Sequence, residues 1–156
     1  MLFPFFEWLE ATAVGSALAQ SLWAFPLIEA AHLVGLTLLG GTLLVGDLRL
    51  LGLGLTNQSI AEVAENMHRW MVGAVVFMLT TGLLLFISEP IKLYFSTSFL
   101  VKMITLPIAL IFTFTVRRRI VRAGTADTTM KTRLVGAASL LLWFTVAAAG
   151  RWIGFS

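Results

Sequence analysis

Four long apolar runs, separated by short polar or charged segments, constrain the fold of this chain more than any other feature. They cover about residues 21–46, 70–88, 99–116 and 134–153. A helix needs roughly 20 apolar residues to cross the hydrocarbon core of a bilayer. We therefore expect an all-α integral membrane protein, a four-helix bundle that forms a single transmembrane domain over residues 1–156.

The composition agrees with a membrane location and excludes several kinds of site. Of the 156 residues, 58% are hydrophobic and 12% are charged, about half the charged share of a soluble domain. The chain has no cysteine, which excludes disulfide bonds, thiolate metal ligands and cysteine nucleophiles. It also has no Walker loop, Rossmann glycine pattern, zinc-ligand spacing or nucleic-acid motif. No catalytic residue is assigned, and any activity is expected to be electron transfer rather than hydrolysis.

The first 20 residues are expected to form an interfacial segment with an N-terminal helix. Phe5, Phe6 and Trp8 give this segment an aromatic side, and Glu7 and Glu10 give it a polar side. Aromatic side chains concentrate at membrane–water interfaces. A helix packed on the bundle is the alternative. A cleavable signal peptide is not expected, because the start carries acidic residues where a signal peptide has basic ones.

Basic residues predict the orientation of the chain in the membrane. Eight of the 11 Lys and Arg residues are expected on one face of the membrane. Six of them belong to the loop that contains Arg117–Arg119, and the other two are Arg49 and Arg69. An excess of Lys and Arg marks the cytoplasmic side of a membrane protein. We expect a multi-pass protein of the cytoplasmic (inner) membrane with its N- and C-termini outside, whose first partner is the lipid bilayer.

Glu29 and His32 are candidates for a functional site within the first apolar run. Their spacing places a carboxylate and an imidazole on one helical face, one turn apart. Ionisable groups at membrane depth are costly, so they mark functional sites by default. A rise of about 1.5 Å per residue places His32 near the bilayer midplane and Glu29 at the depth of Arg151 in the fourth run. We expect Glu29 and Arg151 to form an ion pair.

His32 is also the candidate ligand of a cofactor or a metal. Met78 and Trp143 lie at its depth on the second and fourth runs. Imidazole and thioether can form the axial pair of haem b, and helical bundles hold haem between their helices. A quinone is the other ligand considered. A copper ion held by His32 with Met78 or Met103 is chemically allowed, although nothing in the spacing selects it.

A structural role for His32 is the alternative to ligand binding. Thr80, Thr81 and Thr105 supply hydroxyl groups in this part of the bundle. Pro107 leaves a backbone carbonyl of its own helix without a donor and predicts a kink. A hydrogen bond from His32 to one of these groups would satisfy the imidazole without any ligand.

His68, the second histidine, is not expected to share a ligand with His32. It precedes Trp70 at the membrane boundary, about 20 Å from His32 along the membrane normal by the helical rise. Two axial ligands of one haem must lie almost level. The Glu29-x-x-His32 spacing also resembles half of a di-iron site, but the second copy and the further glutamates that such a site needs are missing.

The charged residues at the predicted cytoplasmic end are interpreted as interfacial. Asp47, Arg49 and Arg69 are expected to form a salt bridge at the level of the lipid headgroups, which contributes little energy. The run Arg117–Arg119 is expected to set the topology and to contact lipid headgroups.

Several stretches resemble a bacterial family of small four-span membrane proteins, a domain of unknown function. They are Trp23 with Pro26, Glu29-x-x-His32-x-x-Gly35, 47–52, 81–86, 99–103, 139–143 and 149–151. The resemblance covers most of the chain and implies no particular activity. The first helix is also distantly similar to the copper-resistance-D group and its haem-binding protoporphyrinogen-oxidase relatives. The chain departs from the first family at 111–116, where an Asn and a Phe-His are expected and a second histidine ligand is therefore missing.

The function expected from these features is a membrane redox component that holds haem b or handles quinone. Its site comprises Glu29, His32, Met78, Trp143 and Arg151. The alternative is a non-catalytic accessory subunit that packs small residues against a larger membrane complex or a second copy. Those small residues are Gly35, Gly40, Gly41, Ala147, Ala148 and Ala149. A small transporter is less favoured, because the sequence contains no inverted repeat.

Overall fold

The protein is an all-α bundle with four helices long and apolar enough to cross a membrane. The computed structural model describes residues 3–123 and 128–154, and within them it contains helices and no strand. The four apolar helical stretches are Ala24–Leu51, Ile60–Ser88, Thr97–Arg122 and Met130–Ile153. The expected fold class is therefore confirmed, and the chain is a multi-pass membrane protein in architecture.

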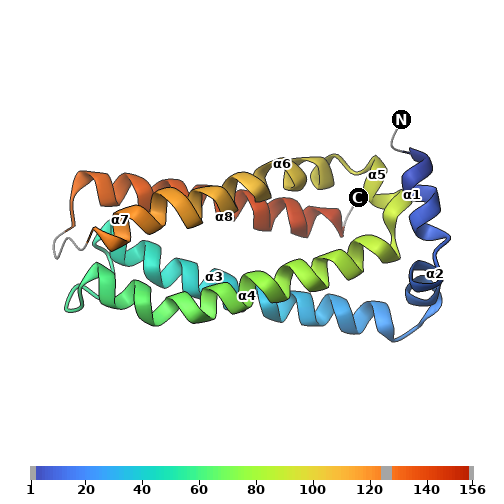
Figure 1. Ribbon diagram of the computed structural model, residues 1–156, viewed down its shortest axis with the longest axis horizontal. Coiled ribbons are helices and arrows are strands. Elements are labelled where there is room, and N and C mark those ends of the chain that lie inside the picture. The colour runs from blue at the N-terminus through green and yellow to red at the C-terminus, as the bar shows by residue number, and fades with distance from the viewer. Residues whose placement is uncertain (1–2, 124–127, 155–156) are drawn as a thin grey trace.

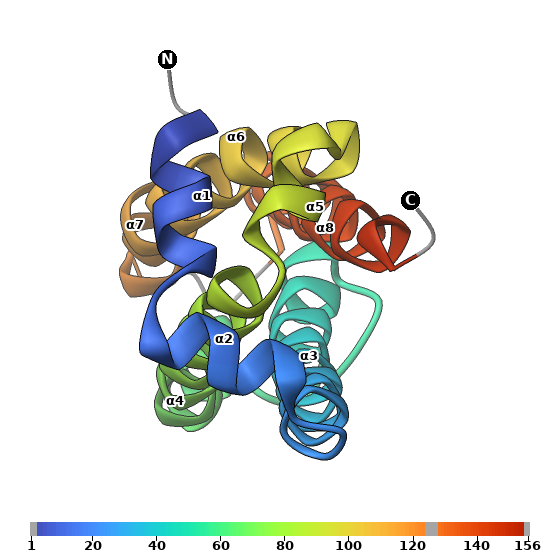
Figure 2. The same cartoon turned by 90° about the vertical axis from the view of Figure 1, so that its right-hand side faces the viewer.

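The long helices pack as two antiparallel pairs that are joined along one side. Figure 1 shows α3 (Ala24–Leu51) beside α4 (Ile60–Ser88), and α6 (Thr97–Phe112) beside α8 (Met130–Ile153). α8 also packs against α3, which connects the two pairs. Viewed from one end, the four helices surround a common axis (Figure 2). The start of α1 and the end of α8 lie at the same end of the bundle (Figure 1), as an even number of crossings requires.

Local capping signals set the ends of the helices that meet at the predicted cytoplasmic end. Ser59 and Glu62 form a capping box at the start of α4: the Glu62 amide donates to the Ser59 hydroxyl at 3.2 Å, and the Ser59 amide donates to the Glu62 carboxylate at 2.8 Å. Gly52 ends α3 with a φ of 78°, a left-handed conformation that glycine adopts without strain. The helix start near Ser59 is as the sequence predicts.

The third membrane-crossing helix is longer than the sequence pattern predicts. The apolar run indicates an end near Val116, but α6 continues through a π-helical turn, η1 (Thr113–Arg117), into the short helix α7 (Arg118–Arg122). Pro107 lies inside α6 and does not end it. The helix therefore carries the arginine run as its last turns, where the sequence interpretation places a loop.

Three short helices close the opposite end of the bundle. α1 (Phe3–Glu10) and α2 (Ala13–Gln20) lie across this end, next to α5 (Pro90–Phe95), as Figures 1 and 2 show. Phe6 is buried and makes edge-to-face contacts with Phe86 and Tyr94, with ring centroids 5.6 and 5.1 Å apart. The N-terminal segment is therefore packed on the bundle. Its position at the membrane interface stays a prediction.

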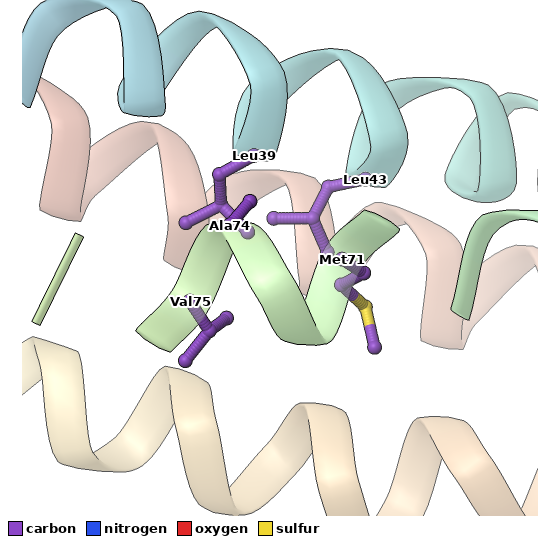
Figure 3. Close-up of a cluster of buried hydrophobic side chains, with 5 residues drawn as sticks. All are labelled: Leu39, Leu43, Met71, Ala74 and Val75. Atoms are coloured by element: carbon purple, nitrogen blue, oxygen red, sulfur yellow. The ribbon is translucent and has the colours of Figure 1, made fainter. Parts of the chain in front are cut away.

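The buried apolar core lies between α3 and α4. Figure 3 shows Leu39 and Leu43 of α3 against Met71, Ala74 and Val75 of α4. Outside this core many large apolar side chains are exposed, including Trp23 at 76%, Leu141 at 69% and Phe144 at 73%. A soluble protein rarely exposes so much contiguous apolar surface. Lipid is the environment in which these side chains are stable.

Candidate functional site

His32 lies at the α3–α4 interface, bonded to a side chain of the neighbouring helix. Its Nδ1 atom is 2.7 Å from the Oγ1 atom of Thr81. The structure thus contains the hydrogen bond to a threonine that the structural interpretation of His32 predicts. His68, on α4, is about 20 Å from Thr81 by the helical rise, so the two histidines are held far apart.

The hydrogen bonds of Thr81 determine which nitrogen of His32 carries the proton. The Thr81 hydroxyl has one hydrogen, and it donates this hydrogen to the Phe77 carbonyl at 2.8 Å. The hydroxyl can therefore only accept from His32, so the neutral imidazole carries its proton on Nδ1. Nε2 then has a free lone pair, and it has no hydrogen-bond partner among residues 3–123 and 128–154.

Two glycines let α3 and α4 approach closely on either side of this hydrogen bond. A Cβ atom added at Gly82 would lie 3.3 Å from the Cε1 atom of His32. A Cβ atom added at Gly35 would lie 2.7 Å from the Phe77 ring and 3.0 Å from the Met78 sulfur. The imidazole of His32 therefore packs against α4 at Gly82, and Met78 fills the interface one turn away, against Gly35.

Lys102 adds an unpaired cation to the third membrane-crossing helix. It lies five residues into α6 and is partly buried. The ammonium rests against α8, where a Cβ atom added at Gly150 would be 3.2 Å from Nζ. Lys102 has no ion pair or hydrogen bond within the described part of the chain. A cation at membrane depth without an anion is costly, so Lys102 is itself a candidate for binding an anionic or polar ligand.

No hydrogen bond or ion pair joins the other predicted site residues to His32 within residues 3–123 and 128–154. Trp143 of α8 donates from Nε1 to the Thr113 hydroxyl at 2.9 Å. Met78 and Trp143 both pack against the buried core of Figure 3. Glu29 is exposed and makes no ion pair with any described residue, so the expected pair with Arg151 is wrong. The two residues were expected at similar depths in the membrane, but both side chains are exposed on the surface of the bundle instead of meeting inside it.

A second polar centre, formed by Asp47 and Arg117, lies near the predicted cytoplasmic end. The Arg117 Nε atom donates to Asp47 Oδ1 at 2.7 Å, and the two side chains are 7% and 0% exposed. A Cβ atom at Gly46 would collide with the Arg117 guanidinium, so this glycine makes room for it. Asp47 Oδ2 and the Ser139 hydroxyl are buried without a hydrogen-bond partner in the described residues.

This geometry corrects the expected headgroup salt bridge of Asp47, Arg49 and Arg69. Asp47 faces the bundle interior and pairs with Arg117 instead. Arg49 donates to the Gln58 carbonyl at 2.7 Å and to the Thr128 hydroxyl at 3.1 Å, which fastens the α3–α4 connection to the start of α8. Arg69 is exposed. The three charges share one end of the bundle, as expected, but they do not bond to one another.

Sequence reasoning missed Lys102 and the Asp47–Arg117 pair for different reasons. A lysine inside an apolar run is a detectable signal, because charged residues at membrane depth are rare. Arg117 could not be distinguished from its basic neighbours in the sequence, because a run of basic residues is typical of a cytoplasmic loop. Only the continuation of the helix through η1 shows that Arg117 points inward while Arg118 and Arg119 remain exposed.

His32 offers a free imidazole nitrogen and Lys102 an unpaired ammonium, but the described residues contain no cluster for a bare metal ion. No group of three or more His, Cys, Asp or Glu side chains comes together in residues 3–123 and 128–154. A single nitrogen is sufficient for a macrocycle that brings most of its own ligands, or for a hydrogen bond to a carbonyl or hydroxyl.

A family model matches residues 5–156, and the chain therefore belongs to that family, described as a family of unknown function (DUF6644). The resemblance to a domain of unknown function is thus confirmed over nearly the whole chain. No curated protein and no solved structure matches it. The distant similarity to the copper-resistance-D group stays a prediction.

Proposed function

We propose that this member of the family is a membrane redox component that binds haem b through the Nε2 atom of His32. The observation that carries the proposal is the hydrogen bond between His32 Nδ1 and Thr81, whose hydroxyl is also bonded to the Phe77 carbonyl. This chain of bonds favours the tautomer with its proton on Nδ1, which leaves the Nε2 lone pair free on a half-buried imidazole between α3 and α4. Histidines that bind metals characteristically donate their second ring nitrogen in this way, which orients the ring and fixes the tautomer.

The ligand inventory favours haem over a bare metal ion. Copper would need two or three further protein ligands, and Met78 packs its sulfur against Gly35 at the helix interface. Haem supplies four nitrogen ligands and one-electron chemistry of its own, so that the chain has to provide only an axial ligand and an apolar site. The Lys102 ammonium offers a counter-charge for the carboxylates that haem carries.

The absorption spectrum of the purified protein tests this proposal. Protein expressed with an ample haem supply should show a Soret band and a reducible b-type spectrum. His32→Ala should abolish both, because Nε2 is the ligand supplied by the chain. His68→Ala is the matched control and should leave the spectrum unchanged, since His68 lies at the far end of α4.

Absence of a Soret band in the wild-type protein, even after titration with haem, would refute the haem proposal. A quinone is the alternative occupant, because the His32 imidazole and the Lys102 ammonium could both bond to a polar head. Organic extraction of the purified protein distinguishes the two ligands. Quinone recovered from the wild type and lost from Lys102→Met would reassign the site to quinone.

An accessory role in a larger membrane complex is the second candidate, supported by two exposed glycines. Cβ atoms added at Gly40 and Gly41 would meet nothing within 4 Å. Small residues on an open helix face allow another helix to approach closely. Gly35 does not belong to this face, because it packs against Phe77 and Met78 inside the molecule. Gly41→Leu should abolish co-purification of a partner subunit from mild detergent, and recovery of the lone wild-type chain would count against this role.

A further inference from the structure

The arginines that end the third membrane helix divide into two groups with different surroundings. Arg117 is buried and paired with Asp47. Arg118, Arg119 and Arg122 point away from that pair and line one cavity of about 250 Å³, together with Phe114 and Thr115. We call this the arginine cavity. It is distinct from the His32 site and independent of the proposed function.

Among the described residues that line it, the arginine cavity has three positive charges and no negative one. Arg118, Arg119 and Arg122 make no ion pair or hydrogen bond with any other residue in the described part of the chain. Arg118 and Arg122 are four residues apart on one helix, a spacing at which like charges destabilise the helix. An anion bound between the guanidinium groups would remove this repulsion.

The donors in the cavity select a phosphate group. Guanidinium groups bind phosphate oxygens through pairs of parallel hydrogen bonds. The Thr115 hydroxyl donates its hydrogen to the Ile111 carbonyl at 2.5 Å, so it is not available as a donor. The three guanidinium groups are therefore the donors that the cavity presents.

The surroundings of the cavity favour a phospholipid over a phosphate from solution. Phe114, which lines the cavity, also packs against the apolar core. Ile111 is 64% exposed and Val116 43% exposed on the same stretch of helix, and in a membrane both lie where acyl chains can cover them. Charge and apolar surface thus adjoin, as the headgroup and chains of a lipid do.

We propose that the arginine cavity binds the phosphate headgroup of an anionic phospholipid. The bias of basic residues places this end of the bundle on the cytoplasmic side, where the leaflet is negatively charged. The proposal goes beyond general contact with the bilayer, because it predicts a saturable site that depends on three named residues.

Native mass spectrometry of the full chain in a neutral detergent tests the site. Phosphatidylglycerol and phosphatidylcholine with identical acyl chains are the probes. Wild-type protein should retain one phosphatidylglycerol in preference to phosphatidylcholine. Since each basic residue near a membrane surface favours an anionic lipid about five-fold, Arg122→Gln should reduce the preference about five-fold and the triple Gln variant of Arg118, Arg119 and Arg122 on the order of 100-fold.

A matched triple variant separates the cavity from net charge. Arg69→Gln, Lys131→Gln and Arg133→Gln remove the same charge from the same end, and all three residues are exposed and lie outside the cavity. This variant should keep the preference. Equal loss in both triple variants, or no preference in the wild type, would overturn the proposal. Inorganic phosphate that competes as strongly as the lipid would overturn the assignment to a lipid. Circular dichroism and Arg122→Gln alone control for misfolding.

Discussion

His32, Asp47 and Trp143 are polar side chains in apolar helices, and each is bonded to a side chain from another segment of the bundle. The partners are Thr81, Arg117 and Thr113, at 2.7, 2.7 and 2.9 Å. Water is not available in the hydrocarbon to satisfy these groups, so each needs a protein partner. These bonds fix the rotation of α3, α4 and α8 about their axes more strictly than apolar contacts do.

Thr81→Val tests whether Thr81 orients His32 for a ligand. Valine keeps the shape of the side chain but removes the acceptor for the Nδ1 proton. Loss of such an orienting bond typically weakens metal affinity about 10- to 100-fold, and we expect haem affinity to fall by this range. Titration of the purified variant with haem measures it.

Thr80→Val is the control for this prediction. Thr80 is exposed, and its hydroxyl donates to the Val76 carbonyl of its own helix at 2.9 Å. Its replacement should leave haem affinity unchanged. Equal haem affinity in Thr81→Val and Thr80→Val would show that Thr81 has no part in binding.

Asp47→Asn should destabilise the fold, because it leaves the Arg117 guanidinium buried without an anion. Removal of one partner of a buried ion pair costs about 3–5 kcal/mol. The free energy of unfolding in mixed detergent micelles is the measurement. Glu29→Gln, which neutralises an exposed carboxylate without a partner, should change it by less than about 0.5 kcal/mol.

The double variant Asp47→Asn/Arg117→Gln distinguishes the pair from other effects. If the ion pair is the cause, the double variant should be less destabilised than the sum of the two single variants. Additive effects would mean that the two side chains stabilise the fold independently.

At the scale of elements, the π-helical turn η1 and Gly46 of α3 together allow the Arg117 side chain to lie inside the bundle. η1 carries Thr113 and Arg117, both buried, between the apolar helix α6 and the exposed arginines of α7. π-helical turns are rare and often occur at functional sites. Gly46, directly before Asp47, leaves the space that the guanidinium occupies.

Gly46→Ala should therefore destabilise the bundle, although alanine is the better helix former. The added methyl group collides with the Arg117 guanidinium, which is anchored by its ion pair, and overpacking of this kind costs about 1–3 kcal/mol. Gly41→Ala, on the same helix with nothing near its Cβ position, should stabilise by up to about 1 kcal/mol. The thermal midpoints of unfolding measure both effects. If the two variants shift the midpoint in the same direction and by the same amount, the Arg117 guanidinium does not restrict the space at Gly46.

At the scale of the whole molecule, the four spans and the distribution of charge make an orientation testable. The α3–α4 connection and α7, whose arginines line the arginine cavity, lie at one end, and α1 and α2 close the other (Figure 1). The bias of Lys and Arg predicts that the first of these ends is cytoplasmic. The chain has no cysteine, so single introduced cysteines report position without background.

Glu7→Cys and Asn57→Cys test the orientation, since both residues are exposed at opposite ends. A membrane-impermeant thiol reagent added to intact cells should label Glu7→Cys and should label Asn57→Cys only after the membrane is opened. The reverse pattern would invert the topology and place the arginine cavity on the outer face.

Most of the fold was predictable because a membrane-crossing helix is encoded locally. The length and apolar character of each run suffice for a span, since the bilayer satisfies its side chains without reference to the other helices. The start of α4 was also predictable from local sequence, because Ser59 and Glu62 have the spacing of a capping box. The continuation of the third membrane helix to Arg122 was not predicted. The charged residues mark the membrane interface, but they do not show where the helix ends.

The site was predictable only in part, because interhelical bonds depend on register and rotation together. Depth estimates from the sequence placed Glu29 level with Arg151, but they contain no information on the direction in which either side chain points. The depth estimates also gave three threonines as candidate hydrogen-bond partners of His32, and the structure shows that Thr81 is the partner.

The sequence by itself determined that this is a four-span helical membrane protein with its arginines concentrated at one end, because those properties are sums over contiguous residues. The tertiary structure decided that His32 bonds to Thr81, that Lys102 lies against α8 without an anion among the described residues, and that Asp47 pairs with Arg117. Each of these depends on how two helices turn toward one another, and that is fixed by the packing of the whole bundle.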